Sequence, residues 1–321
     1  LSSRPMSRVI NPLTEMGANI KSSSGKLPIS ISATSLQKQY RYELPVASAQ
    51  VKSSILLAGL ASGTGVEIIE PIQTRDHTER MLKNFGANIE IASEGSKNII
   101  QLAPSNHLHA KNYKVVGDIS SAAFFFFFSL ISDSPGLEIT NVGMNPSRTG
   151  VLQALQNMGA DIEVRNQRLE SGEPCADLLI KKSVLKGVEL SGDIIPNIID
   201  EIPIISVAAA FAEGETIIRD AEELRVKESD RLEAVSDGFS RLGVAHENFE
   251  DGMSIMGSPN PLLLDQSISI ESHEDHRIAM SFLIAGLKCS KPLTVKNCKN
   301  IFTSFPDFIE LISSIGYKLE K

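Results

Sequence analysis

Apolar residues recur at helical spacing before a glycine at several points along the chain. The phrase LTEMGANI at residues 13–20 returns in close copies at 82–89 and 155–162, and in weaker copies at 240–246 and 313–319. Its apolar spacing predicts a helix, its glycine accepts the left-handed conformation that ends a helix, and the alternating residues that follow predict a strand. The glycines stand at positions 17, 86, 159, 243 and 316, which gives intervals of 69, 73, 84 and 73 residues.

A second pattern alternates with the first and consists of a helix that is apolar on nearly every side, followed by a short strand. The predicted pairs are 50–60 with 66–69, 120–131 with 137–140, 202–212 with 216–219, and 276–287 with 293–295. Such helices belong inside a layer rather than on a surface, and the five phenylalanines Phe124–Phe128 are the clearest case. The two patterns together predict an α/β protein of like units, each of roughly 70 residues, packed into two domains.

A chain of 321 residues is too long for one ordinary core and fits two domains. Residues 112–117 are the expected crossing, which divides a first domain at 1–115 from a second at 116–321. Lys and Arg outnumber Asp and Glu by 13 to 8 in the first part, whereas the second part has 18 against 31. The overall acidity argues against nucleic acid as a partner, and a basic half facing an acidic half is suited to holding a small anion.

Membrane and metal functions find no support in the composition. The longest apolar run, residues 122–130, is about half a bilayer span. The three cysteines lack CxxC spacing, which favours free thiols in a reducing cytoplasm, and the close pair His107 and His109 is interpreted as a polar loop rather than a metal site. The chain begins with Leu1, so no targeting signal is assigned from this end.

Lysine or arginine stands at five predicted helix starts, where the positive end of the helix dipole makes a cation unfavourable. These cations are Arg4, Lys52, Arg75, Lys227 with Arg231, and Arg277. A cation beside free backbone N–H groups forms an anion site. The alternative at each start is neutralisation by a neighbouring Asp76, Asp230 or Asp275 on a solvated surface. Recurrence at five starts favours a ligand with two or more anionic groups.

Carboxylates among these cations are candidates for proton transfer. Asp200 and Glu201 open a predicted buried helix, and Glu228 lies between Lys227 and Arg231. A helix cap is the alternative role for Asp200. A carboxylate that shares an anion site with its ligand is a candidate acid or base. The sequence contains no phosphate-loop, dinucleotide-binding, zinc-protease or nucleophile-elbow motif.

Seven short motifs, in order along essentially the whole chain, resemble the EPSP synthases (3-phosphoshikimate 1-carboxyvinyltransferases), which are enolpyruvyl transferases. They are SRP at 3–5, SAQ at 48–50, TRDHTE at 74–79, GDISSAA at 117–123, RVKESDRL at 225–232, EDHRIAM at 274–280 and SFPD at 304–307. The resemblance implies two similar domains, each of three βαβαββ-type units, with ligands in the interdomain cleft. It also implies that roughly a hundred residues of the first domain precede Leu1, about one and a half repeats.

The activity implied by the resemblance is transfer of the enolpyruvyl group of phosphoenolpyruvate to the 5-hydroxyl of shikimate 3-phosphate, with release of phosphate. This is a cytoplasmic step of aromatic amino acid biosynthesis, carried out by a monomer without metal or organic cofactor and without a nucleic acid or membrane partner. By position, the implied catalytic residues are Asp200 and Glu228. The implied phosphoenolpyruvate-binding residues are Arg4, Gln50, Arg231 and Arg277. The implied shikimate 3-phosphate-binding residues are Ser48, Ala49, Gln50, Thr74, Asp200 and Lys227.

Three positions depart from the family pattern. Ala49 stands where some relatives have serine, so a contact there runs through the backbone, Glu223 lies near an asparagine position, and Thr303 occupies a lysine position. Two other functions stay open: the related transferase that acts on UDP-N-acetylglucosamine, and an inactive anion-binding fragment of the same fold.

Overall fold

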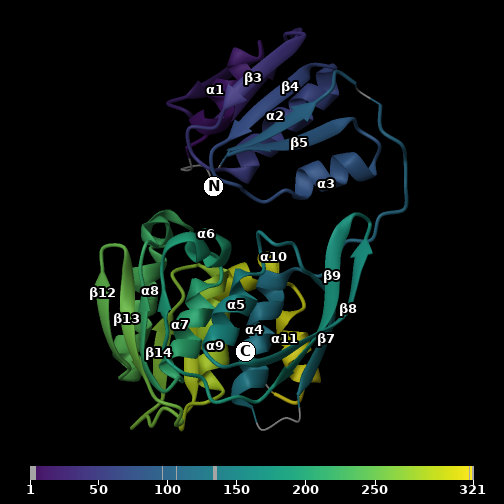
Figure 1. The fold of residues 1–321 in the computed structure, drawn as a ribbon. Helices are drawn as coiled ribbons and strands as arrows, with labels where there is room; N and C mark the ends of the chain where they lie inside the picture. The colour runs from purple at the N-terminus through teal and green to yellow at the C-terminus, as the bar shows by residue number, and fades with distance from the viewer. Residues whose placement is uncertain (1–4, 96, 106, 133–135, 318, 320–321) are drawn as a thin grey trace. The chain divides into compact units, whose positions relative to one another are not determined.

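The computed structural model describes residues 5–95, 97–105, 107–132, 136–317 and 319, which form two compact units with separate hydrophobic cores (Figure 1). Unit 1 comprises Leu1–Val115 and Leu169–Glu173, and unit 2 comprises Val116–Arg168 and Pro174–Lys321. Both units mix helices with strands, as the α/β prediction requires.

Unit 1 contains a complete βαβαββ unit. Its elements in chain order are β3 (Gln39–Glu43), α2 (Ala49–Ser62), β4 (Gly65–Glu70), α3 (His77–Asn84), β5 (Ile89–Glu94) and β6 (Lys97–Leu102). The strands form one sheet in the order β3-β4-β6-β5, in which β3 and β4 are parallel and the other pairs antiparallel. A partial unit precedes it, with α1 (Ser7–Glu15) and the antiparallel pair β1 (Asn19–Ser23) and β2 (Lys26–Ser32).

Unit 2 repeats this plan. Its helices are α4 (Ile119–Ile131), α5 (Gly150–Asn157), α6 (Ile195–Ile198), α7 (Ile202–Ala210), α8 (Arg231–Leu242), α9 (His276–Gly286), α10 (Ile301–Ser304) and α11 (Phe308–Ser314), with short 3-10 turns at Gly192–Ile194, Glu222–Val226 and Cys298–Asn300. Its strands are β7 (Leu137–Gly143), β8 (Asp161–Glu170), β9 (Glu173–Lys181), β10 (Glu189–Leu190), β11 (Gly214–Ile218), β12 (Ala245–Phe249), β13 (Gly252–Gly257), β14 (Ile268–Glu271) and β15 (Leu293–Lys296).

The sheets of unit 2 show the same strand order as the sheet of unit 1. Strands β10-β11-β13-β12 begin with a parallel pair and continue antiparallel. In the sheet β7-β9-β8, an isolated parallel bridge from Gly117 to Val142 stands where a first strand would pair. Strands β14 and β15 form a parallel pair on either side of α9 in the chain. The βαβαββ-type unit is therefore the common building block.

The glycine of the repeated phrase has the backbone conformation predicted for it. All five glycines have positive φ, with values of 106°, 90°, 93°, 70° and 96° in chain order. Gly243 is the C-cap of α8, whose apolar residues at helical spacing are all buried. This left-handed turn ends each helix and leads the chain into the segment that follows.

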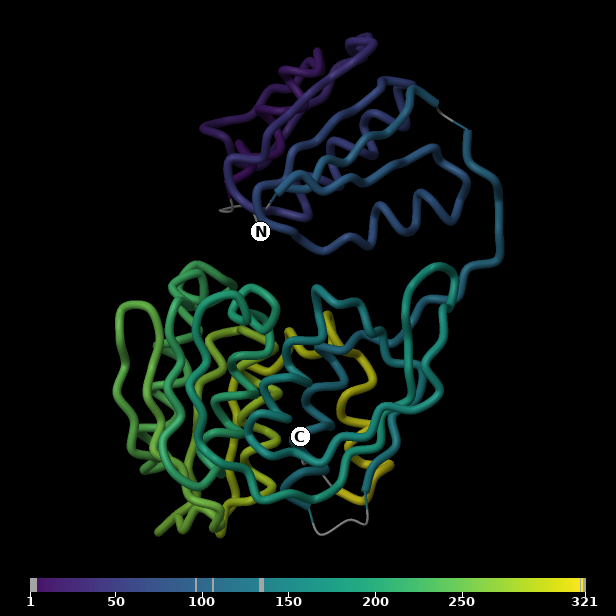
Figure 2. Tube along the Cα trace, in the orientation of Figure 1, coloured from purple at the N-terminus to yellow at the C-terminus, as the bar shows by residue number. Residues whose placement is uncertain are grey.

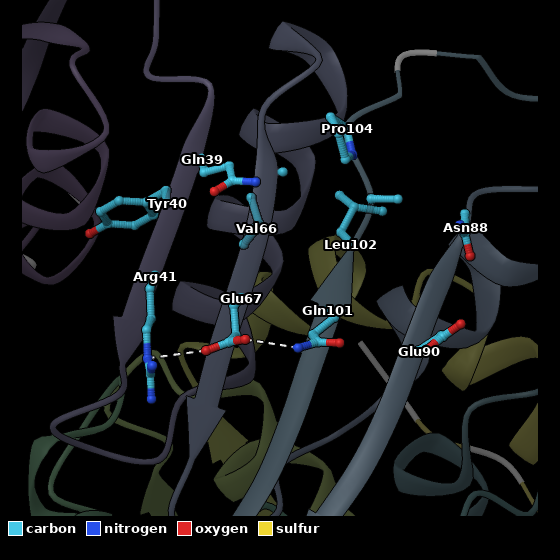
Figure 3. A pocket seen from close by; sticks show the side chains of 12 residues that line it. Gln39, Tyr40, Arg41, Val66, Glu67, Asn88, Glu90, Gln101, Leu102 and Pro104 are labelled. Atoms are coloured by element: carbon cyan, nitrogen blue, oxygen red, sulfur yellow. Dashed lines mark hydrogen bonds and ion pairs between the residues drawn. The ribbon is translucent and has the colours of Figure 1, made fainter.

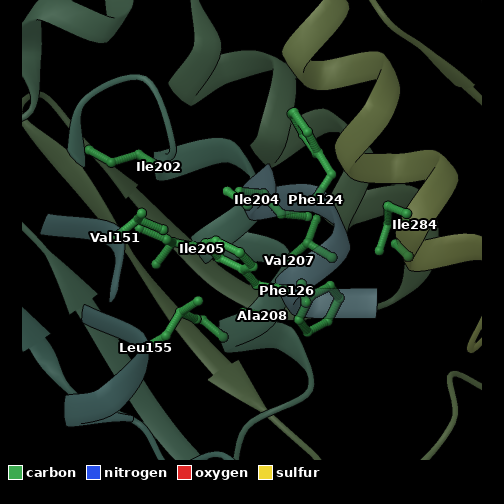
Figure 4. Close-up of a cluster of buried hydrophobic side chains, with 14 of the residues drawn as sticks. Phe124, Phe126, Val151, Leu155, Ile202, Ile204, Ile205, Val207, Ala208 and Ile284 are labelled. Atoms are coloured by element: carbon green, nitrogen blue, oxygen red, sulfur yellow. The ribbon is translucent and has the colours of Figure 1, made fainter. Parts of the chain in front are cut away.

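The apolar helices of unit 2 pack against one another, as predicted. Helices α4, α7 and α9 are in mutual contact and run close together in the Cα trace (Figure 2). All nine residues of α7 are buried, and each of Phe124–Phe128 is at most 7% exposed. Figure 4 shows Phe126 of α4 among Ile205 and Ala208 of α7. These helices therefore form an inner layer of the unit.

The same prediction is wrong for α2 in unit 1. Helix α2 packs against α1, β4 and β6, but Leu57 on its remaining side is 52% exposed. A uniformly apolar sequence indicates that a helix is fit for burial on all sides, whereas actual burial depends on how many neighbouring helices surround it. Among the residues described here, no helix is long and apolar enough to cross a bilayer.

Close packing of α8 on α9 depends on Gly238. A Cβ at this buried position would lie 2.0 Å from Cζ of Phe282, whose ring is 0% exposed and cannot move into solvent. We predict that Gly238→Ala lowers the free energy of unfolding by about 1–3 kcal/mol, because overpacking outweighs the better helix propensity of alanine. Urea unfolding followed by circular dichroism measures the change.

The matched control is Ser240→Ala, at an exposed position of the same helix. It also gains helix propensity, by less than Gly→Ala does, and it introduces no clash, so its stability should be equal to or slightly above that of the unmodified chain. Equal stability of the two variants would contradict the packing argument.

Candidate active site

The starts of three helices in unit 2 meet at the guanidinium group of Arg231. Its Nε atom donates to Asp275 Oδ2 at 2.8 Å, Nη2 donates to Glu228 Oε2 at 2.7 Å, and Nη1 lies 3.4 Å from Asp200 Oδ1. The carboxylates precede α9, α8 and α7 respectively. One planar cation therefore holds three acidic side chains from separate segments.

Local sequence explains why α8 and α9 begin where they do. Asp230 caps α8 by accepting from Glu233 N at 3.0 Å, and Asp275 caps α9 by accepting from Arg277 N at 2.8 Å. Asparagine and aspartate are favoured at this position because the side-chain oxygen satisfies an N–H group that the helix leaves unpaired. Asp275 thus caps one helix with Oδ1 and binds Arg231 with Oδ2.

The Arg231–Asp275 pair is buried. The side chains are 2% and 0% exposed, and Ser229 Oγ adds a hydrogen bond to Asp275 Oδ2 at 3.2 Å. Burial alone would raise the pKa of Asp275, but the attraction and hydrogen bond of Arg231 outweigh burial and hold that pKa below its usual value. Asp275 is therefore a fixed negative charge that orients Arg231.

Arg277 lies on the same side of the cluster as Asp200. Its Nη1 donates to the main-chain oxygen of Asp200 at 2.8 Å and lies 3.6 Å from Glu201 Oε1. Asp200 is not the cap of α7, because Glu201 occupies the N-cap position and makes no capping hydrogen bond. The carboxylate of Asp200 is turned to Arg231, which argues against the capping alternative.

The sequence placed Glu201 beside Asp200 at the start of a buried helix but assigned it no ligand role, and Ser120 and Arg148 were not singled out as site residues. Glu201 is 2% exposed, and Ser120 Oγ donates to its Oε1; Arg148 in turn bonds to Ser120 and, at 2.9 Å, to Asp118. Burial raises the pKa of Glu201 above its usual value, with Arg277 and Ser120 opposing the rise. The sequence signal for this contact was the GDISSAA motif, because its Ser120 bonds to Glu201 at the start of α7.

Lys227 binds Glu223 at 2.5 Å across one helical turn, so two residues flagged from the sequence are partners. Asp230 binds Arg225 rather than Arg231. Each of these cations contacts a carboxylate or carbonyl oxygen, so the neutralisation weighed as the alternative for helix-start cations is present at Arg231 and Arg277. Arg231 does not lie on a solvated surface, however, because its side chain is only 2% exposed.

Four predicted ligand-binding residues lie in unit 1. Ser48 caps α2 by accepting from Val51 N at 3.4 Å, and Ala49 and Gln50 form the first turn. Thr74 lies between β4 and α3, where it donates from N and Oγ1 to Glu70 Oε1. The first-turn N–H groups of a helix lack intrahelical acceptors, which makes this turn a suitable place for an anion.

Lys52 does not belong to a ligand site, contrary to the expectation for helix starts. Its side chain is 0% exposed, and its Nζ lies 2.6 Å from Glu79 Oε1 and 3.0 Å from Glu70 Oε1. A buried ammonium group needs such partners because removing a charge from water is costly. A lysine within an otherwise apolar helix was the signal that two carboxylates had to be near.

Two other positions considered from the sequence, Arg4 and Thr303, give no further information about the site. Arg4 lies outside the described residues. Thr303 lies on α10 and is exposed. Among the residues the structure describes, no group of three or more His, Cys, Asp or Glu side chains could hold a metal ion.

A hollow over the sheet of unit 1 contains none of the predicted site residues. Figure 3 shows Arg41 and Gln101 on either side of Glu67 in this hollow. Arg41 Nε lies 3.1 Å from Glu67 Oε1, and Gln101 Nε2 donates to Glu67 Oε2 at 2.8 Å. These polar groups satisfy one another across β3, β4 and β6. The hollow is therefore the polar outer face of a sheet.

A family model described as EPSP synthase (3-phosphoshikimate 1-carboxyvinyltransferase) matches residues 1–312. The chain belongs to the EPSP synthase family. Curated relatives named 3-phosphoshikimate 1-carboxyvinyltransferase include that of Vesicomyosocius okutanii, 47% identical over 319 residues, and that of Rhizobium johnstonii, 46% identical over 324. These alignments cover 99% and 100% of this chain and 72% of each relative.

Solved structures give the same assignment. EPSP synthase from Acinetobacter baumannii is 45% identical with a TM-score of 0.88, covering 100% of this chain and 72% of the other. The enolpyruvyl transferase NikO from Streptomyces tendae has a TM-score of 0.78 at 18% identity, over 98% of this chain and 72% of the other, and shows the shared fold. The two curated relatives named above carry the shikimate name, and the chain has the fold of EPSP synthases.

The buried pair at the centre of the cluster gives a stability prediction. Asp275→Asn keeps an oxygen that caps α9 but removes the most deeply buried of the three carboxylates around Arg231, so the free energy of unfolding should fall by about 1.5–3 kcal/mol at pH 7. Because the pKa of Asp275 is lowered in the folded state, its contribution is present at neutral pH and is lost as pH falls through that pKa. Urea unfolding between pH 7 and pH 3 measures both effects.

Asp237→Asn is the control, since Asp237 is 56% exposed and 3.7 Å from His273. Its stability should change by less than about 0.5 kcal/mol. A loss for Asp275→Asn that is no larger than the loss for Asp237→Asn would show that the buried pair does not stabilise unit 2.

Proposed function

We infer that this chain transfers the enolpyruvyl group of phosphoenolpyruvate to the 5-hydroxyl of shikimate 3-phosphate and releases phosphate, the shikimate-pathway reaction of its family. The observation that carries the assignment of roles is the pairing of Asp200 and Glu228 with two nitrogens of one guanidinium group, that of Arg231. Two carboxylates held close together by a shared cation are suited to move protons at adjacent atoms of bound substrates.

The reaction needs one base and one acid. We assign Asp200 as the base that accepts the proton of the 5-hydroxyl, whose oxygen then attacks C2 of phosphoenolpyruvate. We assign Glu228 as the acid–base residue at the methylene carbon, which gains a proton in the addition step. In the elimination step the new methyl group loses a proton, the C–O bond to phosphate breaks, and the enol ether forms. Exposed fractions of 18% for Asp200 and 37% for Glu228 support access of ligand to both side chains.

Arginine side chains are proposed to bind the anionic groups of phosphoenolpyruvate. These arginines are Arg231 and Arg277 of unit 2 and Arg4, and Gln50 of unit 1 is proposed to bind phosphoenolpyruvate with them. Arg231 is occupied by three carboxylates, of which Glu228 is the most exposed. A phosphate or carboxylate group of the substrate would therefore compete with Glu228 for Nη2, and its binding would free Glu228 to approach the methylene carbon.

Shikimate 3-phosphate is assigned to two groups of residues. In unit 1 these are Ser48, Ala49, Gln50 and Thr74, which lie at the first turn of α2 and in the loop before α3. In unit 2 they are Asp200 and Lys227. The helix start at Ser48 favours the phosphate, because backbone N–H groups and the helix dipole both attract an anion.

We further propose that the chain works as a monomer in the cytoplasm, with no metal or organic cofactor. The three cysteines are free thiols, in keeping with a reducing compartment. All assigned residues come from a single chain, so the proposed chemistry requires no second copy.

Phosphate release that depends on both substrates tests the function, and Asp200→Asn tests the base. We predict that this variant loses at least ~100-fold in kcat, because asparagine cannot accept the hydroxyl proton. Its affinity for shikimate 3-phosphate, measured by titration calorimetry, should change little. The control is Asp193→Asn, an exposed position outside the cluster. Near-normal turnover of Asp200→Asn would remove Asp200 from the mechanism, and no release by the unmodified chain would overturn the proposed function.

Arg277→Ala is predicted to act on phosphoenolpyruvate. Removal of a charged donor should raise the KM for phosphoenolpyruvate by roughly tenfold or more, with a smaller change in the KM for shikimate 3-phosphate. Arg241→Ala provides the comparison, because Arg241 is exposed in the last turn of α8. Steady-state kinetics with each substrate varied in turn gives both constants. Equal KM values in the Arg277 and Arg241 variants would exclude Arg277 from the binding site.

A further inference from the structure

Unit 1 contains a buried cluster of three charged side chains that the proposed chemistry does not use. We call Lys52, Glu70 and Glu79 the Lys52 triad; they are 0%, 1% and 2% exposed. Lys52 comes from α2, Glu70 ends β4, and Glu79 lies in the first turn of α3. The triad therefore ties α2 to β4 and α3, the two elements that flank the loop of Thr74.

The triad contains one cation and two carboxyl groups. Burial raises the pKa of Glu79 above its usual value, although Lys52 opposes the rise, and Glu79 Oε2 has no hydrogen-bond partner among the described residues. Glu70 differs, because its Oε1 accepts from Lys52 Nζ at 3.0 Å, from Thr74 N at 3.0 Å and from Thr74 Oγ1. Glu70 is thus the member of the triad that acts on the loop.

The direction of the bond between Thr74 and Glu70 follows from the other two bonds. An ammonium group and a backbone N–H can only donate, so Glu70 Oε1 is an acceptor and carries no proton. The hydroxyl of Thr74 must then donate its single hydrogen to Glu70. What remains at Thr74 Oγ1 for a ligand is lone pairs.

We propose that the Lys52 triad is a positioning device that fixes Thr74 as a hydrogen-bond acceptor for a ring hydroxyl of shikimate 3-phosphate. This inference rests on the proposed function and deepens it. The phosphate of the substrate offers only acceptors at its ionised oxygens, so it cannot bond to a hydroxyl whose hydrogen is already used. A ring hydroxyl supplies the hydrogen that Thr74 can accept. Glu70 and Lys52 act through Thr74 and touch no substrate.

Two ligands separate the ring from the phosphate. Titration calorimetry with shikimate 3-phosphate and with unphosphorylated shikimate should show the same fractional loss of affinity for Thr74→Val, about 5- to 10-fold for the loss of one hydrogen bond. A loss confined to the phosphorylated ligand would show that Thr74 contacts phosphate and would overturn the proposal.

Variants of Glu70 test the positioning step. Glu70→Met removes the acceptor, so its affinity for both ligands should fall as in Thr74→Val, and the double variant should lose no more than either single variant. At saturating shikimate 3-phosphate, kcat should stay within about twofold, because a positioning residue for binding does not touch the reacting atoms. Hydrogen exchange of the Thr74 amide should become faster, because its acceptor is gone. Unchanged affinity in folded Glu70→Met would overturn the proposal.

Two further variants separate positioning from folding. Glu67→Gln changes a carboxylate of the same strand that bonds to Arg41 and Gln101 on the sheet face, and it should leave binding unchanged. If Glu70→Met does not fold, Glu70→Gln replaces it: its amide oxygen still accepts from Thr74, so affinity should be largely kept, and a loss as large as in Thr74→Val would contradict the proposal. If the unmodified chain binds neither ligand, the proposed function fails and this inference fails with it; if it binds both and Thr74→Val binds equally well, only the inference fails.

Discussion

The arrangement of helix starts in unit 2 depends on the ion pairs of the Arg231 guanidinium group. This group bonds to carboxylates that precede three different helices, and it does so at 2% exposure, where an unpaired charge would be costly. Without this cation, Asp200, Glu228 and Asp275 would repel one another. With it, the two carboxylates that we propose for proton transfer, Asp200 and Glu228, bind adjacent nitrogens of one planar group.

Packing of apolar helices explains why those helix starts meet at all. Helices α7, α8 and α9 contact one another in the core of unit 2, so their N-terminal ends lie near one another. Their interior faces carry few polar atoms. Charged residues lie at the starts of α7 and α9, and in α8 they lie at its start and along its exposed face. The same division recurs in unit 1, where α2 carries apolar residues along its length and has Ser48 and Gln50 at its start. The same helices therefore supply the hydrophobic core along their length and the candidate site at their N-terminal ends.

Much of this could be predicted from the sequence because the signals are periodic and local. The glycine phrase predicted each helix end, and Phe124–Phe128 predicted a buried helix. What could not be predicted were contacts between distant residues: Ser120 and Glu201 are 81 positions apart, and Lys52 and Glu70 are 18 apart. A pattern of spacing indicates which face of a helix is buried, but it does not identify the side chain on the other side. For that reason Lys52 was grouped with ligand-binding cations, although it is a buried structural charge.

The five left-handed glycines have a consequence for the way such a chain can change over time. At each of them a helix ends with the same backbone hand, and each repeat leaves its helix in the same way. Segments exchanged between homologous genes at these glycines would enter and leave with matching backbone geometry. Recombination at these points would keep the backbone direction at each junction, and strands paired across a junction, such as β4 with β6, would have to remain compatible.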